Sequence, residues 1–148
     1  NKADEAKKKF YKGWLYIGDL GTWNEAEFVS IVGRKDDMII SGGENIQPVQ
    51  VEEAINECPQ VQENVVVGMP HEKWGEVVVA YVVKRDPSLT ASQLDEFCRD
   101  HPMLARYKRP KYYRFVEQLP LTATGKKIHY KVKQQATEDA DQGLLEKI

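Results

Sequence analysis

Residues 33–52 read GRKDDMIISGGENIQPVQVE and contain a strand, a glycine turn and the start of a helix in one short stretch. Met38 and the two isoleucines after it predict a strand, which Gly42 and Gly43 end with backbone angles that other residues rarely adopt. Pro48 suits the first turn of a helix, in which apolar residues then recur three and four positions apart. The stretch therefore predicts a strand and a helix joined by a loop that another molecule can approach closely.

Periodic apolar patterns predict the elements that follow. Strands are expected at residues 64–68, 76–84 and 111–117, and helices at residues 48–58, 90–101 and 128–136. Thr90 and Gln93 form a capping box at the start of the second helix. The second strand is apolar on both faces, which is typical of a strand inside a sheet. This order predicts an α+β fold: a small sandwich of a short hairpin and a mixed β-sheet flanked by helices.

Upstream of this unit, residues 13–34 are rich in aromatic and β-branched side chains and predict short strands. We therefore divide the chain into a strand-rich lead at residues 1–35, a second unit at residues 36–136 and a loosely held acidic tail at residues 137–148. Because the chain opens with Asn and a charged tract, we expect it to be a piece of a longer protein.

The composition restricts the class of protein. With 148 residues, 41% of them hydrophobic, the chain suits one domain with a packed core and an extra segment. Lys and Arg number 21 against 23 for Asp and Glu, so net charge attracts neither nucleic acid nor an anionic membrane. The absence of a long apolar run or a signal peptide predicts a cytoplasmic protein without a membrane span. Cys58 and Cys98 fall in apolar helix registers, which favours buried free thiols over a disulfide.

Residues 120–127, PLTATGKK, resemble a phosphate-binding loop at first sight. That motif requires a glycine five residues before its second glycine, and Ser or Thr after its lysine. Those two positions hold Pro120 and Lys127. The phosphate-loop interpretation is therefore excluded, and the Gly-Lys pair needs another explanation.

Three ordered motifs supply that explanation: GWLYIGDLG at residues 13–21, the opening stretch at residues 33–52, and KRPKYYRFVEQLPLTATGKK at residues 108–127. Together they resemble the C-terminal part of the adenylate-forming superfamily, and most closely bacterial aryl-CoA and medium-chain acyl-CoA ligases. The resemblance covers residues 13–133. It implies that residues 1–35 end a large N-terminal adenylation domain and that residues 36–136 form the mobile C-terminal domain.

The resemblance also implies an enzyme, an AMP-forming acid–thiol ligase. A carboxylate attacks the α-phosphate of ATP to give an acyl-adenylate and pyrophosphate, and the thiol of CoA then displaces AMP. The C-terminal domain rotates against its own N-terminal domain between the two steps. Mg²⁺ is expected in the intact enzyme, but its ligands and the acid-binding pocket precede this chain, which implies that the fragment alone is inactive.

For adenylation, the resemblance makes Lys126 the catalytic residue, a fixed positive charge that stabilises the α-phosphate in the transition state. Lys127 is then expected to face solvent or the last helix. Asp19 is expected to bind the ribose hydroxyls, and Arg34 to add a cationic donor to the nucleotide. Asp36 is the expected hinge. At Ile17, where relatives usually carry Thr, the turn before Asp19 departs from the family pattern.

For the CoA step, the resemblance implies that Gly42, Gly43 and Glu44 replace the lysine at the nucleotide and line a tunnel for the pantetheine arm. Trp74 is expected to pack along that arm, a feature shared by only some relatives, with an ordinary partly exposed aromatic side chain as the alternative. The basic cluster around Pro110 is expected to bind the nucleotide end of CoA, with a solvated charge run as the alternative interpretation. Its proposed CoA contacts are Tyr107, Arg109 and Lys111.

Other interpretations stay open. The acceptor is either free CoA or the phosphopantetheine arm of a carrier protein, with luciferase chemistry as a remote third. A non-catalytic interaction module belongs to another class, and the sequence before Asn1 would distinguish it. The resemblance also implies that a protein acetyltransferase can modify Lys126 and remove its charge. The acid is not identified, because the residues that select it lie upstream.

Overall fold

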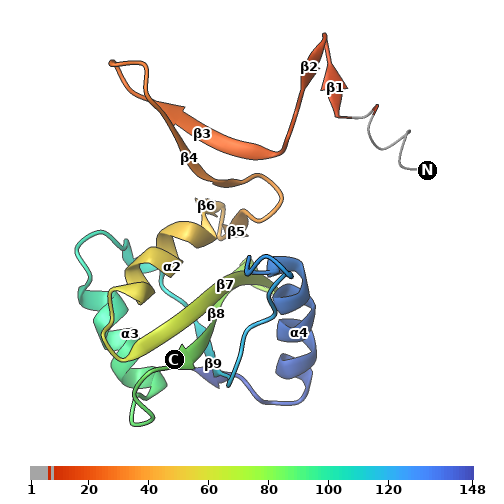
Figure 1. Ribbon diagram of the computed structural model, residues 1–148. Helices are drawn as coiled ribbons and strands as arrows, with labels where there is room; N and C mark the ends of the chain where they lie inside the picture. The colour runs from red at the N-terminus through yellow and green to blue at the C-terminus, as the bar shows by residue number, and fades with distance from the viewer. Residues whose placement is uncertain (1–6, 8) are drawn as a thin grey trace. The chain divides into compact units, whose positions relative to one another are not determined.

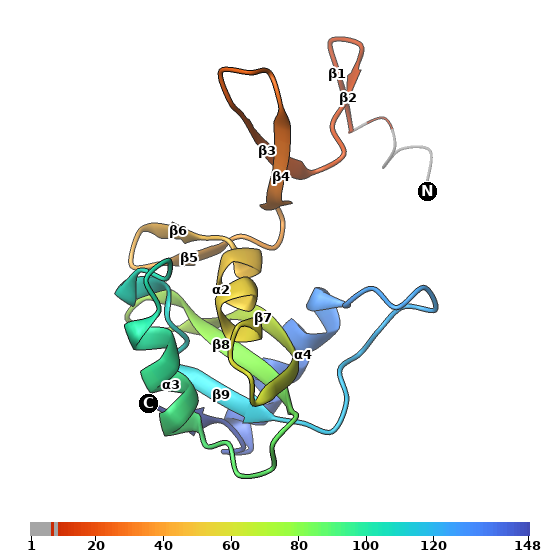
Figure 2. The same ribbon diagram turned by 60° about the vertical axis from the view of Figure 1, so that its left-hand side comes forward.

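A computed structural model describes Lys7 and residues 9–148 of the chain. The chain divides into two compact units, with the division between Asp36 and Asp37. Figure 1 and Figure 2 show the elements of both units from two directions.

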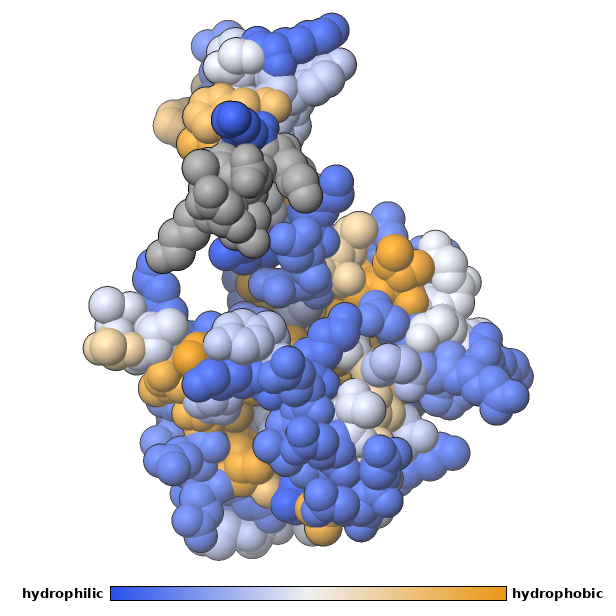
Figure 3. Space-filling view, turned by 90° about the vertical axis from the view of Figure 1, so that its right-hand side faces the viewer, coloured by the Kyte–Doolittle hydropathy of each residue, from blue (hydrophilic) through white to orange (hydrophobic). Residues whose placement is uncertain are grey.

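The first unit consists of two antiparallel hairpins. Strand β1 (Phe10–Tyr11) pairs with β2 (Trp14–Leu15), and β3 (Asp19–Trp23) pairs with β4 (Val29–Arg34). Among its described residues none is a buried hydrophobic residue, and most of its large apolar side chains are exposed, as Figure 3 shows for one face. Such a surface is typical of a contact area.

The second unit contains a six-stranded mixed sheet, which confirms the predicted α+β fold. Its strands follow the order β10-β9-β8-β5-β6, and β7 pairs with the other edge of β8. Strands β8 and β9 are parallel, and the other pairs are antiparallel. The strand bounds are β5 (Ile39–Ser41), β6 (Glu44–Ile46), β7 (Val61–His71), β8 (Gly75–Lys84), β9 (Tyr112–Phe115) and β10 (Glu146–Lys147).

Helices cover both faces of this sheet (Figure 1). Helices α2 (Pro48–Asn56) and α3 (Ala91–Asp100) share one apolar cluster with Val66, Val78 and Ala80, whereas α4 (His129–Asp141) shares the other with Val65 and Val79. A short 3₁₀ helix, η1 (Arg106–Lys108), precedes β9. Both faces of β8 are covered, so its sequence is a nearly continuous apolar run, as expected.

Several local predictions are confirmed. The side chain of Thr90 accepts the backbone N–H of Gln93, and Gln93 returns a bond to the backbone of Thr90, which completes the capping box. Cys58 and Cys98 are buried free thiols. Burial raises the pKa of the Cys98 thiol to about 12, so it is protonated at neutral pH. No helix in the described part of the chain is both long enough and apolar enough to cross a membrane.

Two predicted boundaries differ from the structure. The connection between the strands expected at residues 64–68 and 76–84 is much shorter than predicted, since β7 continues through Pro70 to His71 and β8 begins at Gly75. Proline is tolerated there because β7 is an edge strand and one side of its backbone needs no partner.

The tail predicted at residues 137–148 is partly ordered. Helix α4 continues to Asp141, and β10 pairs with β9. The reason is Asp139, which is buried and accepts hydrogen bonds from Tyr81 Oη (2.8 Å) and Gln135 Nε2 (2.8 Å). This contact fixes the last turns of α4 on the sheet.

Candidate active-site loops

The predicted catalytic lysine lies on a tightly closed loop, residues 120–128, which we call the lysine loop. Its ends are joined by an isolated bridge between Leu121 and Lys127 and by the bond from Ile128 N to Pro120 O (3.0 Å). Thr122 closes the tip, because its N donates to Lys126 O (2.8 Å) and its Oγ1 accepts from Lys126 N (3.0 Å). The Lys126 side chain is exposed, and it makes no ion pair with any described residue. Its charge is therefore available to a ligand.

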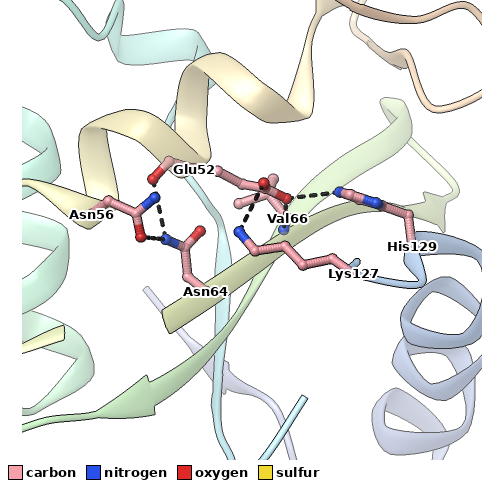
Figure 4. A network of polar contacts seen from close by, with 6 residues as sticks. All are labelled: Glu52, Asn56, Asn64, Val66, Lys127 and His129. Atoms are coloured by element: carbon pink, nitrogen blue, oxygen red, sulfur yellow. Dashed lines mark hydrogen bonds and ion pairs between the residues drawn. The ribbon is translucent and has the colours of Figure 1, made fainter. Parts of the chain in front are cut away.

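Lys127, the next residue, has a different role from the one predicted. Its Nζ lies 3.2 Å from Oε2 of Glu52, a buried carboxylate on α2 (Figure 4). The expectation that Lys127 faces solvent or the last helix is therefore wrong. A buried carboxylate strongly favours a positively charged partner. The sequence of the loop alone could not reveal this partner, because Glu52 lies far from the loop along the chain.

Glu52 also binds the segment beyond Lys127. Its Oε1 lies 2.8 Å from Nε2 of His129 and accepts the backbone N–H of Val66 (2.9 Å) (Figure 4). Burial raises the pKa of the Glu52 carboxyl, but these hydrogen bonds and the charge of Lys127 together lower the pKa below its ordinary value. The hydrogen bond to Glu52 raises the pKa of His129, against the opposing effect of burial. Both shifts favour the ionised side chains.

The second predicted loop is the turn between β5 and β6. We call these two strands and their turn the glycine hairpin (residues 39–46). Gly42 and Gly43 have φ angles of +59° and +88°, a region that L side chains rarely adopt. The N–H of Gly42 donates to Trp74 O (2.9 Å), and a Cβ at Gly42 would lie 3.1 Å from the Trp74 ring. The structure thus brings two of the predicted CoA residues, Gly42 and Trp74, into contact. Gly43 has open space around it, and Glu44 is exposed.

A separate carboxylate supports this hairpin. Glu76 on β8 accepts the backbone N–H of Ile40 (3.0 Å) and binds Lys133 of α4 (2.7 Å). The side chain of Glu76 passes directly over Gly68, where a Cβ would lie 3.0 Å from its carboxyl carbon. Glycine at position 68 therefore gives Glu76 room to reach both partners.

The predicted CoA phosphate residues differ in exposure. Tyr107 and Lys111 are exposed, whereas only 19% of the Arg109 side chain is accessible. Arg109 Nε lies 2.7 Å from Oδ1 of Asp95, a close charge contact in which the N–H is not aligned for a hydrogen bond. Lys108 Nζ donates to Gln50 (2.8 Å). Of the two predicted phosphate-binding cations, Arg109 and Lys111, Lys111 is therefore the more accessible.

In the first unit, the two predicted nucleotide residues are cross-strand neighbours. Asp19 and Arg34 face each other in β3 and β4, with 3.5 Å between Oδ1 and Nε. Arg34 Nη2 also donates a hydrogen bond to Ile17 O (3.4 Å). The turn at Ile17, which departs from the family pattern, is therefore in contact with the Asp19–Arg34 pair. Asp36, the predicted hinge, lies in the turn that ends this unit.

The chain also contains a pocket that no motif predicted. It has a volume of about 440 Å³ and lies between β8, β9 and α4. Its buried acid, Asp139, is paired with Tyr81, Gln135 and Arg114 (3.3 Å to Nε). Because these polar groups satisfy one another, we interpret the cluster as packing of α4. Among the described residues, no group of three or more His, Cys, Asp or Glu side chains could hold a metal ion.

Comparison with known proteins identifies the family. Residues 50–126 match the family model described as the AMP-binding enzyme C-terminal domain. The chain belongs to this family. The match begins inside α2, includes Glu52, and ends at Lys126. It confirms the resemblance to the adenylate-forming superfamily.

Relatives of this C-terminal domain are CoA ligases. The chain is 41% identical over 138 residues to a 2-succinylbenzoate–CoA ligase of Bacillus cereus (strain AH820), covering 93% of this chain and 28% of that protein. Among solved structures, it resembles o-succinylbenzoate CoA synthetase from Bacillus subtilis in complex with the acyl-adenylate OSB-AMP (TM-score 0.78, 38% identity, 86% of this chain and 26% of that one). It also resembles a Mycobacterium tuberculosis fatty acyl CoA synthetase (TM-score 0.72, 38% identity, 93% and 27%). The chain spans little more than a quarter of these relatives.

Four polar residues of this AMP-binding C-terminal domain were missed by sequence reasoning: Glu52, Glu76, Asp95 and His129. Glu52 carried a detectable signal, since it falls beside the apolar stripe of its helix, where a charge needs a partner. The other three lie at positions whose partners are distant in the sequence.

Proposed function

We propose that the intact protein is an ATP-dependent, AMP-forming acyl-CoA or aryl-CoA ligase. The observation that carries this proposal is the pairing, in one C-terminal domain, of an exposed lysine on a closed loop with a glycine hairpin beside a tryptophan. The first feature suits adenylation and the second suits passage of a thiol-bearing arm. The CoA-ligase names of the relatives support the same chemistry.

In adenylation, Lys126 is the electrostatic residue. Negative charge grows on the α-phosphate as the carboxylate oxygen attacks, and a preset ammonium stabilises that charge more in the transition state than in the ground state. In this role Lys126 acts as a fixed positive charge, not as a base. Asp19 and Arg34 hold the ribose and the nucleotide. In the intact enzyme, Mg²⁺ would be bound by residues of the N-terminal domain.

In the CoA step, the glycine hairpin takes the place of the lysine loop after the C-terminal domain rotates about Asp36. Gly43 leaves room for the pantetheine arm, because it lacks a side chain and no described atom lies within 4 Å of its Cβ position. Trp74 offers a flat apolar face beside that arm, and Glu44 lies at the edge of the path that the arm takes. The rotation is a hinge motion, which needs only a few residues that tolerate two conformations.

The nucleotide end of CoA is bound by Lys111, with Arg109 and Tyr107 beside it. Lysine and arginine suit phosphates as a point charge and as a planar donor, respectively. The charge contact between Arg109 and Asp95 makes Arg109 partly structural. Lys111→Ala is therefore the cleaner test of phosphate binding, because Arg109→Ala would also leave a buried carboxylate without its partner.

Two alternatives predict different products. If the acceptor is a carrier-protein arm, the thioester forms on that protein and not on free CoA. If the chain acts as a non-catalytic interaction module, no adenylate forms at all. The basic segment favours free CoA, since a carrier-bound arm lacks the 3′-phosphate nucleotide.

An assay of the full-length protein tests the proposal. The protein is incubated with ATP, Mg²⁺, CoA and a panel of aryl and fatty acids that includes 2-succinylbenzoate, and AMP and acyl-CoA are measured. We expect equal amounts of AMP and CoA thioester with at least one acid. Thioester formation only on an added carrier protein would favour the first alternative, and no AMP with any acid would contradict the proposal. The fragment alone is expected to be inactive.

Two further expectations from the sequence stay predictions. The exposed Lys126 is accessible to a protein acetyltransferase, and acetylation would remove the charge that adenylation needs. A cytoplasmic location is also expected.

A further inference from the structure

Glu52 is a buried charge that the proposed mechanism does not use. Only 6% of the residue is exposed, and none of the predicted ligand contacts is assigned to it. Its carboxylate has three partners: Lys127 Nζ, His129 Nε2 and the backbone N–H of Val66. Burying a carboxylate is costly, and three partners are more than a simple helix–sheet contact requires. The position of these partners suggests a further role for Glu52.

The partners of Glu52 lie immediately after the catalytic lysine. Lys127 follows Lys126 directly, and His129 is the first residue of α4. Figure 4 shows both side chains reaching the carboxylate, one from the loop and one from the helix start. One carboxylate thus fixes the end of the lysine loop on both sides of Ile128.

The orientation of Lys126 follows from this contact. Lys127 forms a bridge with Leu121, and successive side chains of an extended segment point to opposite sides. With Lys127 directed inward to Glu52, the side chain of Lys126 is directed outward, and it is exposed. Without the ion pair, either lysine of the Gly-Lys-Lys sequence could occupy the outward position.

The position of Glu52 itself is firmly set. Its backbone O accepts from Asn64 Nδ2 (3.1 Å), which also donates to Asn56 Oδ1 (2.7 Å). These bonds and the N–H of Val66 fix α2 on β7. The carboxylate therefore joins a rigid helix–sheet pair to a loop whose tip is exposed.

We propose that Glu52 is a positioning residue for adenylation: by binding Lys127 and His129 it holds the lysine loop so that Lys126 is presented to the reacting phosphate. This inference rests on the proposed function. It restricts the effect to one half-reaction, because the glycine hairpin is held by a different carboxylate, Glu76.

The test uses the full-length enzyme with Glu52→Gln, which keeps the size of the side chain and removes its charge. We expect adenylate formation to slow about ten- to a hundredfold, the scale of a small misplacement of a catalytic group. The capture of supplied acyl-adenylate by CoA should stay within about twofold of wild type. Glu53→Gln, at the exposed neighbouring position on the same helix, is the matched control and should leave both rates unchanged.

A second variant covers the case in which Glu52→Gln does not fold. Lys127→Gln removes the loop's ion pair but leaves Glu52 with His129 and Val66, and it should slow adenylation alone by about three- to tenfold, since fewer contacts are lost. In a double mutant, the two effects should not add, because both act on one contact. Equal slowing of both half-reactions, or unchanged adenylation in both variants, would overturn the inference.

Lys126→Ala separates this inference from the proposed function. If Lys126→Ala slows adenylation and neither Glu52→Gln nor Lys127→Gln does, the positioning role fails while the proposed function stands. If Lys126→Ala leaves adenylation unchanged, the catalytic role of Lys126 fails, and the positioning role of Glu52 fails with it. The proposed function itself fails only if the wild-type enzyme forms no AMP with any acid.

Discussion

The lysine loop and the glycine hairpin belong to the same unit of the chain but present opposite surfaces. The lysine loop offers a charged side chain on a backbone closed by its own hydrogen bonds. The glycine hairpin offers bare backbone and open space beside an aromatic ring. One loop can stabilise developing charge, and the other can let an elongated ligand pass.

The supports of the two loops also differ. A buried carboxylate on α2 holds the lysine loop through side chains, whereas Glu76 on β8 holds the glycine hairpin through a backbone N–H. The two carboxylates share no partner among the described contacts. Under the proposed function, each half-reaction therefore has its own supporting carboxylate in this unit.

Removal of the charge from the lysine loop should give the largest effect. In the full-length enzyme, Lys126→Ala should slow adenylation by about a hundred- to a thousandfold, the scale of losing one preset electrostatic contact. Single-turnover formation of acyl-adenylate measures this rate. Lys131→Ala, at another exposed lysine beyond the loop, should leave the rate unchanged. An unchanged rate in Lys126→Ala would remove Lys126 from the chemistry.

A methyl group in the glycine hairpin should give an intermediate effect on the other half-reaction. Gly43→Ala should slow CoA capture of supplied adenylate about tenfold, which corresponds to ~1.4 kcal/mol. The matched control is Gly143→Ala, because Gly143 also has a positive φ (+68°) and open space but lies after α4. Both variants should lose about 1 kcal/mol of folding free energy through the left-handed backbone. Equal CoA capture by the two variants would argue against a tunnel at Gly43.

The smallest effect is expected outside both loops, at the basic segment. Lys111→Ala should raise the apparent KM for CoA about two- to fivefold, the scale of an exposed charge pair. With dephospho-CoA, which lacks the 3′-phosphate, the same variant and the wild type should have equal KM values. An equal rise with both substrates would assign Lys111 to another part of the cofactor or to none.

Local signals predicted much of this fold. The capping box of Thr90 and Gln93 was predictable because both partners lie within one helical turn. The apolar run in β8 likewise indicated a strand covered on both faces. The full length of β7 was not predictable, because Pro70 is tolerated in it only where the strand pairing leaves β7 at the edge of the sheet.

The site was predictable in part. The motifs identified the two loops and the family, but they could not show that Lys127 binds Glu52, which lies 75 positions away along the chain. Nor could the motifs show that Arg109 is in charge contact with Asp95, a residue outside them. Contacts between distant charges depend on the packed fold, and an isolated motif does not contain that information.

The central claim is that the two loops serve separate half-reactions, and a crossed single-turnover experiment tests it most directly. Adenylate formation and CoA capture of supplied adenylate are measured in parallel for Lys126→Ala and Gly43→Ala in the full-length enzyme. We expect opposite patterns: slow adenylation with normal capture for Lys126→Ala, and normal adenylation with slow capture for Gly43→Ala. The same pattern in both variants would contradict the account.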